Sequence, residues 1–431
     1  MLTPQDNERI TRVGRGTAMG DLMRRYWMPA ALSAELVVDE APLRVKLLGE
    51  KLVAFRDSAG RVGVLDEFCA HRCASLFLGR NEDNGLRCVY HGWKYDVEGR
   101  LVDQPTEPAG KEFKDRIRLT AYPTIERGGL VWAYMGPADR MPPPPDFSWA
   151  VVPESHRFVE KSWQECNWLQ ALEGGVDSAH VGWLHRTMGN LTSDPGVGGI
   201  WSQPRTTADE VEETEYGHLY ASTRHLADGR KWVRIYHFVM PFHVQFALEL
   251  GHGESGWTNH ERYIPQASGN MWVPMDDENC MFYTWTAKYG VEPLTAAERE
   301  YRARIGGRGP GEQLADYRKR RNKDVDWMID RAKQRTSTFS GVDGIATQDH
   351  AVQESMGAIV DRSREHLGAT DRAVVVMRRI MLDAMNTVEQ GGAPPGVDTS
   401  YYNIVARERI LAGNADWRAE LRPRCFRVAA E

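Results

Sequence analysis

The sequence predicts an α+β protein, in which a small all-β domain precedes a larger domain of mixed helices and strands. Two observations carry this prediction. From about residue 43 to residue 140, short stretches of alternating apolar and polar residues are separated by tight turns containing glycine, a pattern typical of strands joined in hairpins. The stiff run Met-Pro-Pro-Pro-Pro-Asp at 141–146 then ends this pattern, as a boundary between domains would.

The expected elements can be placed in order along the 431 residues, a length that suits two or three domains. Residues 1–42 are expected to be helical in part and to pack on the larger domain. The all-β domain covers 43–140, and the larger domain covers 147–431. Within the larger domain the sequence predicts a helix near 161–186, strands across 205–290, a charged helical stretch at 296–335 and a final helix around 371–389.

The composition excludes several classes of protein. The net charge is −6 with both signs mixed throughout, so no basic face indicates a nucleic-acid partner. No apolar run approaches the roughly 20 residues of a membrane span, and the first residues lack the basic and then apolar plan of a secretory signal. Six cysteines in a chain of this length do not suggest a disulfide framework. We therefore expect a cytoplasmic protein, in which thiolates can bind a metal.

The most informative feature is the pattern Cys-x-His-x16-Cys-x2-His, formed by Cys69, His71, Cys88 and His91. Each half offers one thiolate and one imidazole within a tight turn. A [2Fe–2S] cluster with two cysteines on one iron and two histidines on the other needs this pairing. A structural zinc site is the alternative, because two cysteines and two histidines also satisfy tetrahedral zinc. Zinc modules usually pair like with like, so the spacing favours the cluster.

A second group of polar residues lies at 167–185. Asn167, Gln170, Glu173, Asp177 and His180 recur every three or four residues, which places them along one face of a helix. The apolar residues around them leave little face for solvent, so this polar stripe is predicted to point into an interior cavity. Buried polar side chains need partners, and a metal with hydrogen-bonded ligands would supply them.

His180 and His185 are five residues apart, which is an awkward spacing for a helix. Five residues rotate by about 500°, so the two rings would point ~140° apart. Both rings can face one metal only if the helix widens into a π-turn or ends between them, and we predict such an irregularity at 180–185. Two histidines and one carboxylate on one face of an iron leave positions open for O₂ and substrate.

With both motifs present, the chain resembles the catalytic α subunits of Rieske non-haem iron aromatic-ring oxygenases, and most of all the phthalate dioxygenase group. The resemblance covers nearly the full length. It is carried by the motifs at 69–91 and 167–185 and extends to Trp-Val-Pro-Met-Asp-Asp at 272–277 and Gln-Asp-His-Ala-Val-Gln-Glu-Ser-Met-Gly at 348–357. It implies an all-β Rieske [2Fe–2S] domain and a larger, helix-grip-like catalytic domain with an antiparallel sheet covered by helices.

The resemblance also implies the cofactors, one Rieske [2Fe–2S] cluster and one mononuclear Fe(II) per subunit. The cluster would be held by the four residues of the first motif, and the iron by His180, His185 and Asp349. Spacing alone could not choose Asp349 from the other nearby carboxylates, which are Asp343, Glu354 and Asp361.

Asp177 would be a bridge, hydrogen-bonded to His180 of its own subunit and to His91 of the partner subunit. This role implies a homotrimer or stacked trimers.

Electrons would come from NAD(P)H through a reductase that carries flavin and a plant-type [2Fe–2S] cluster. The charged stretch at 296–335 is most simply a solvent-facing surface, with docking of the reductase as the alternative.

The reaction implied is oxidation of an aromatic carboxylate with O₂, most simply ring cis-dihydroxylation of the phthalate type. The alternative within the family is O-demethylation or another monooxygenation of a methoxylated aromatic acid. A non-catalytic Rieske electron carrier and a zinc-stabilised binding protein are the alternatives from other classes. A carrier would need only the first domain, so the second metal motif argues against it.

A carboxylate substrate requires a cationic anchor in an otherwise apolar pocket. Arg234 lies in a strand-like segment rich in apolar residues and is the first candidate, with an ordinary ion pair as the alternative. Arg205 and Arg224 are fainter candidates.

Overall fold

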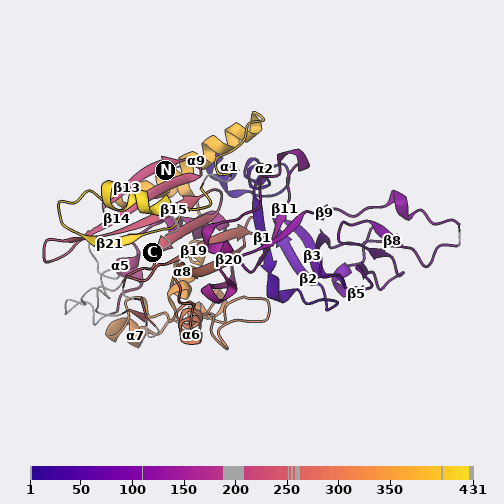
Figure 1. Cartoon of the computed structure of the whole chain (residues 1–431), viewed down its shortest axis with the longest axis horizontal. Helices are drawn as coiled ribbons and strands as arrows, with labels where there is room; N and C mark the ends of the chain where they lie inside the picture. Colours follow the sequence, from indigo (N-terminus) through magenta and orange to yellow (C-terminus); the bar gives the residue numbers. More distant parts are fainter. Residues whose placement is uncertain are drawn as a thin grey trace. The chain divides into compact units, whose positions relative to one another are not determined.

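The computed structural model describes residues 2–108, 110–187, 208–250, 252–253, 256–257, 263–398 and 401–426 (Figure 1). The chain divides into two compact units, Val13–Pro145 and Met1–Arg12 together with Asp146–Glu431. Residues 13–42 belong to the smaller unit because β1 (Trp27–Leu32) pairs with β11 (Leu130–Tyr134). The expectation that all of residues 1–42 pack on the larger domain is corrected for this part. Only the first twelve residues, with helix α1 (Pro4–Thr11), belong to the larger unit.

In the described part of the smaller unit, the strands form three antiparallel sheets, with the orders β1–β11–β10, β2–β3–β4–β9 and β5–β6–β7–β8. The helix and remaining strands are α2 (Ala18–Met23), β2 (Leu43–Leu47), β3 (Glu50–Arg56), β4 (Val62–Asp66), β5 (Arg80–Glu82), β6 (Gly85–Arg87), β7 (Lys94–Tyr95), β8 (Leu101–Asp103), β9 (Ala121–Tyr122) and β10 (Thr124–Arg127). Gly49 and Gly60 have positive φ angles of 82° and 81°, so they form the tight turns expected between the first strands.

The core of the smaller unit lies directly beneath the first metal motif. Val53, Leu65 and Tyr95 are fully buried in one apolar cluster that also contains Cys69 and Cys88. Both cysteines are only 2% exposed. The strands therefore supply a rigid base on which the two cysteine loops are fixed.

The larger unit is built on one antiparallel sheet with the order β12–β20–β19–β16–β15–β14–β13, and β21 pairs with β15 (Figure 1). These strands are β12 (Arg157–Gln164), β13 (Ala208–Thr214), β14 (Gly217–His225), β15 (Lys231–Val239), β16 (His243–Ala247), β19 (Gln266–Pro274), β20 (Cys280–Lys288) and β21 (Glu408–Leu411). Two short strands, β17 (His252–Gly253) and β18 (Gly256–Trp257), pair separately. The predicted α+β class and the strands predicted across 205–290 are thus confirmed from Ala208 onward.

Helices of the larger unit pack on this sheet, and α4 lies against β19, β16, α8 and α9. The helices are α3 (Ser148–Val151), α4 (Trp168–Val176), α5 (Val181–Leu184), α6 (Ala296–Ile305), α7 (Arg331–Thr336), α8 (Ile345–Glu354), α9 (Arg372–Glu389) and α10 (Trp417–Glu420). The helix predicted around 371–389 is confirmed as α9, but it is not the final one, because the short helix α10 follows it. No helix in the described part of the chain is long and apolar enough to cross a membrane.

The helix predicted near 161–186 is wrong over its first part. Residues up to Gln164 form strand β12, because they pair along their length with β20. The helix begins after Asn167, whose side chain accepts a hydrogen bond from the Leu169 amide and so caps α4. It ends at Val176, since Asp177 has extended backbone angles (φ −76°, ψ 122°).

The charged stretch at 296–335 is not one continuous helix. It contains α6, a short 3₁₀ helix at Lys323–Met328 and most of α7. The backbone after α6 turns at Gly307 and Gly311, which have φ angles of 62° and 80° that glycine alone adopts without strain. Charge pattern alone did not reveal these interruptions.

A buried ion-pair network ties α4 to α9. Nε and Nη2 of Arg362 each donate to the Glu173 carboxylate at 2.9 Å. Nε of Arg378 donates to the same carboxylate at 2.6 Å. Arg362 is fully buried, with 0% of its surface exposed. Burial alone would raise the pKa of Glu173, but the two guanidiniums outweigh it and hold that pKa below its ordinary value.

We expect Glu173→Gln to destabilise the protein by about 3–5 kcal/mol, because it leaves the fully buried Arg362 guanidinium without a charged partner, while Arg378 keeps Glu365. Urea unfolding followed by tryptophan fluorescence measures this loss. Glu389→Gln is the matched control, since Glu389 pairs with Arg9 at a surface site where both side chains are 30–51% exposed. An ion pair of that kind contributes about 1 kcal/mol or less. Equal losses in the two variants would contradict the role assigned to Glu173.

Candidate active site

A cavity of about 220 Å³ is lined by one face of the large sheet and by α4, α6 and α8. The sheet contributes alternate residues, because successive side chains of a strand point to opposite faces. These residues are Phe158 and Glu160 from β12, Arg234 and Tyr236 from β15, Phe246 from β16, Ser268, Asn270 and Trp272 from β19, and Phe282, Thr284 and Thr286 from β20. Most of the accessible surface of the wall is apolar, with polar side chains set among the aromatic rings, so the cavity suits a flat apolar ligand that carries polar groups.

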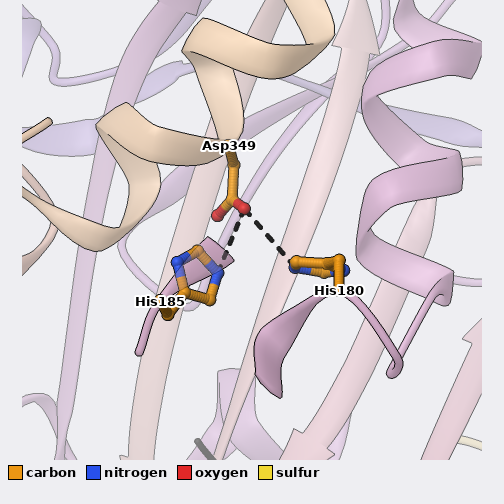
Figure 2. A group of neighbouring side chains, drawn as sticks. All are labelled: His180, His185 and Asp349. Carbon is orange, nitrogen blue, oxygen red and sulfur yellow. Dashed lines mark ion pairs between the residues drawn. The ribbon is translucent and has the colours of Figure 1, made fainter. Parts of the chain in front are cut away.

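Three candidate metal ligands line this cavity. Figure 2 shows the Asp349 carboxylate, carried by α8, pointing toward the imidazoles of His180 and His185. Oδ1 of Asp349 lies 3.5 Å from Nε2 of His180 and 3.2 Å from Nε2 of His185. Ligand atoms of the three residues lie within 4.8 Å of one another, and no other such group occurs among the residues that the structure describes. This arrangement is a facial set of two imidazoles and one carboxylate.

The predicted irregularity at 180–185 is confirmed, and the chain also breaks before it. Helix α4 ends at Val176, and α5 is a single turn that ends at Leu184, so His185 lies outside it. The two imidazole centroids are 5.2 Å apart. Gly175 permits this bend against the sheet, since a Cβ there would lie 2.0 Å from the Trp272 ring.

Each imidazole is held by a second residue on the side away from Asp349. Oδ2 of Asp177 lies 3.3 Å from Nδ1 of His180. Oε1 of Gln348 lies 2.7 Å from Nδ1 of His185, and the Gln348 amide nitrogen donates to the Val342 carbonyl. Both rings are therefore oriented with Nε2 toward the centre of the group, since a hydrogen bond at one ring nitrogen fixes which way the other nitrogen faces a metal.

The imidazole of His180 and the carboxylates that face it shift one another's pKa values. Burial alone would lower the pKa of His180, but Asp177 and Asp349 outweigh it and raise the pKa to about 10. Burial alone would raise the pKa of Asp349, but His185 and His180 hold it well below its usual range. A metal bound at Nε2 of His180 would compete with a proton for this imidazole, so metal affinity would fall as the pH is lowered.

The structure also explains why Asp349, rather than a neighbouring carboxylate, faces the histidines. Asp343 forms an ion pair with Lys333 at 2.8 Å. Oε2 of Glu354 accepts a hydrogen bond from the Trp327 indole at 2.7 Å. Asp361 caps the turn that follows it. Oδ1 of Asp349, by contrast, is buried without a hydrogen-bond partner in the described part of the chain, which suits a metal ligand.

In the smaller unit, the two halves of the first motif form turns of the same construction. The carbonyl of Cys69 accepts a hydrogen bond from the Cys73 amide at 2.9 Å, and that of Cys88 accepts one from the Gly92 amide at 3.0 Å. Cys73 and Gly92 both have positive φ angles, 57° and 74°. The two turns bring the rings of His71 and His91 to 4.4 Å between centroids.

The polar atoms around these turns form a donor set that a metal cluster would fit. Nδ1 of His71 is buried without a hydrogen-bond partner among the described residues, and the ring stacks on Trp93. Cys69 and Cys88 form no disulfide. Sγ of Cys69 lies 3.2 Å from the Tyr95 hydroxyl, while burial raises the pKa of this thiol. A bound metal would overcome that effect, since a coordinating thiol is deprotonated.

Comparison with known proteins identifies the family. Residues 26–123 match the Rieske [2Fe–2S] domain, and residues 133–424 match the LigXa C-terminal domain like family. The chain is 38% identical to the 3-chlorobenzoate-3,4-dioxygenase oxygenase subunit of Comamonas testosteroni, over 97% of both chains. It is 39% identical to the phthalate 4,5-dioxygenase oxygenase subunit of Pseudomonas putida, over 97% of this chain and 94% of that one. The chain belongs to the Rieske non-haem iron oxygenases.

The fold of this Rieske oxygenase agrees with that assignment. It resembles dicamba monooxygenase with a TM-score of 0.58 and 16% sequence identity, covering 85% of this chain and 98% of that one. The predicted enzyme class is confirmed: the protein is an oxidoreductase, and the cofactors of its family are a Rieske [2Fe–2S] cluster and a mononuclear iron. The two donor sets suit these groups, two thiols with two imidazoles for the cluster and two imidazoles with one carboxylate for the iron.

The three arginines predicted as substrate anchors lie in different surroundings. Arg234 lines the cavity, but its Nε and Nη2 donate to the Ala247 carbonyl at 2.9 and 2.5 Å. Arg224 does not line the cavity, because its guanidinium lies over the Trp232 ring and donates to the Ser178 carbonyl; this prediction is corrected. Arg205 lies outside the described residues.

Two residues of the site were missed from sequence. Gln348 directly precedes Asp349, so its position beside a ligand was a usable signal. Arg302 lines the cavity from α6, within the charged stretch interpreted as a solvent-facing surface. Neither the residue type of Arg302 nor its spacing in the sequence indicated that it lies in the cavity wall.

We expect Gln348→Leu to weaken retention of the mononuclear iron by about 10-fold or more, because His185 loses the partner that orients its ring. Iron content after dialysis against a chelator measures this loss, and the visible spectrum of the cluster serves as the internal reference. Val352→Gln is the control, since Val352 is 39% exposed on the same helix. Unchanged iron retention in Gln348→Leu would refute the orienting role.

Proposed function

We propose that this chain is the oxygenase component of a system that oxidises an aromatic carboxylate with O₂, by ring cis-dihydroxylation of the phthalate type. The observation that carries the proposal is the set of His180, His185 and Asp349 at the wall of a largely apolar cavity. A ferrous ion held by these residues would supply binding and reductive activation of O₂, because a facial triad leaves coordination positions open.

The cavity residues would position the substrate. The rings of Tyr236, Phe246, Trp272 and Phe282 line one continuous space with the candidate ligands. Aromatic walls hold an aromatic ring by offset or edge-to-face packing and exclude water from it. Two relatives, similar over nearly their whole length, are named for 3-chlorobenzoate and phthalate, both aromatic carboxylates, which supports this substrate class.

Asp177 is proposed to connect the two cofactors between subunits of a homotrimer or of stacked trimers. Within its own subunit Asp177 contacts His180. In the proposed assembly its carboxylate would also accept a hydrogen bond from His91 of the partner subunit, so electrons would pass over a short path. NAD(P)H would supply these electrons through a reductase that carries flavin and a plant-type [2Fe–2S] cluster. We propose a cytoplasmic location, because the six cysteines of this chain form no disulfide and thiols stay reduced in the cytoplasm.

The most informative experiment supplies the purified oxygenase with reductase, NADH and ¹⁸O₂ and analyses products from phthalates, benzoates and methoxybenzoates. We expect a cis-diol that carries two labelled atoms from a benzoate or phthalate. A phenol with formaldehyde from a methoxybenzoate would instead indicate O-demethylation. The fold leaves this choice open, since it is shared with an enzyme named as a monooxygenase.

The cofactor content tests the proposal before any substrate is known. Purified protein should be red-brown, with a Rieske cluster spectrum and additional iron that His185→Ala or Asp349→Ala removes without changing that spectrum. Product formation should fall to background in both variants, because each lacks one ligand of the triad. Colourless protein that contains only zinc would overturn the proposal and favour a zinc-stabilised binding protein.

We expect Asp177→Asn to slow product formation by about 100-fold while the cluster spectrum and iron content stay at wild-type levels. The amide keeps an acceptor for the Ala179 amide hydrogen but removes the charge that faces Nδ1 of His180. Stopped-flow reoxidation of the reduced cluster, with substrate and O₂ present, measures the affected step. Reoxidation at the wild-type rate would exclude the bridging role.

A further inference from the structure

Arg302 stands apart from the other charged residues of the cavity. The last turn of α6 (Ala296–Ile305) places Arg302, with Ile305, in the wall that the candidate iron ligands also line. Its Nε is buried and has no hydrogen-bond partner in the described part of the chain. No ion pair to its guanidinium occurs among the described residues either. Arg302 as a whole is partly buried, and a buried donor such as its Nε is uncommon without a partner unless a ligand completes it.

The two other arginines of the cavity wall are already engaged. Nε of Arg308 forms an ion pair with Glu160 at 2.9 Å. Arg234 donates twice to the Ala247 carbonyl, and its Nε lies 4.0 Å from the buried carboxylate of Glu408. Neither guanidinium therefore offers an uncompensated charge comparable with that of Arg302.

No carboxylate near the cavity forms an ion pair with Arg302 among the described residues, although Glu298, one turn earlier on α6, attracts its charge. Asp177 and Asp349 face the imidazole of His180, and Glu160 faces Arg308. Glu298, on the same helix as Arg302, is bound by Lys288 at 2.8 Å and by the Thr295 amide. Burial lowers the pKa of Arg302 to about 10, so the side chain remains cationic at neutral pH.

We propose that Arg302 is the anchor for the carboxylate of the substrate and thereby determines specificity for aromatic acids. The inference rests on the proposed function, because it assumes that the substrate is an aromatic carboxylate. A guanidinium presents parallel N–H donors that match the two oxygens of a carboxylate. An acid bound there lies in the same cavity as His180, His185 and Asp349, with its ring against the aromatic wall.

Binding of 3-chlorobenzoate and of its neutral counterpart 3-chlorobenzamide to the holoenzyme tests this role by titration calorimetry. Phthalate with dimethyl phthalate forms a second pair. We expect Arg302→Gln to weaken acid binding at least about tenfold, the effect of losing a charge-assisted contact in a dry site, and to leave the neutral compounds within about twofold. Arg304→Gln is the matched control, since Arg304 is exposed on the same helix and does not line the cavity.

Equal weakening of acid and amide in Arg302→Gln would show a structural role and overturn the proposal. So would wild-type acid binding in Arg302→Gln combined with its loss in Arg234→Gln, which would make Arg234 the anchor. A crystal structure of the wild-type holoenzyme with the acid decides the question if Arg302→Gln fails to fold. A carboxylate oxygen within about 3.2 Å of the Arg302 guanidinium supports the proposal, and any other position overturns it.

The same titrations separate this proposal from the proposed function. A wild-type enzyme that binds and oxidises the acids, with no change in Arg302→Gln, refutes only the anchor. A wild-type enzyme that binds no aromatic acid but oxidises neutral aromatics refutes the proposed substrate class itself.

Discussion

The larger unit depends on one constraint: two imidazoles close in sequence must turn toward a carboxylate from a distant helix. Gln348, on that helix, contacts His185 although the two residues are 163 positions apart in the sequence. A continuous helix through both histidines would point their rings in different directions. The break after Val176 and the single turn of α5 remove this conflict. The buried pairing of Glu173 with Arg362 and Arg378 then holds α4 in place beside the break.

The sheet and the helices contribute different parts of the cavity. Residues of β12, β15, β19 and β20 form a wall in which the rings of Phe158, Tyr236, Trp272 and Phe282 lie among polar side chains, which suits a substituted ring. The helices supply the groups with chemistry, His180 and His185 around α5, Asp349 on α8 and Arg302 on α6. This division is physically reasonable, because paired strands fix the wall rigidly while helix ends and breaks allow polar side chains to converge. Among the charged side chains in the described part of the cavity wall, Arg302 alone has no compensating partner.

The first motif reaches its geometry by a different route. Each cysteine loop is a local turn closed by its own backbone hydrogen bond and by one residue with positive φ. Nothing from a distant part of the chain is needed to bring Cys69 near His71 or Cys88 near His91. The apolar core beneath the loops only fixes the two turns relative to each other. Because each turn is built locally, the positions of Cys69, His71, Cys88 and His91 in the sequence were enough to predict a metal cluster site.

The sequence by itself determined the family and the class of fold, and it predicted the four cluster ligands and the two iron histidines, because the motifs that indicate them are made of residues a few positions apart. It also predicted the irregularity at 180–185 from helix geometry alone. It misassigned 161–164 to a helix, since only pairing with β20 makes that segment a strand. Tertiary structure alone showed that Gln348 orients His185, that Arg234 is engaged and that Arg302 is not. Whether a side chain has a partner is decided by packing between segments that lie far apart in the chain, and no local pattern records it.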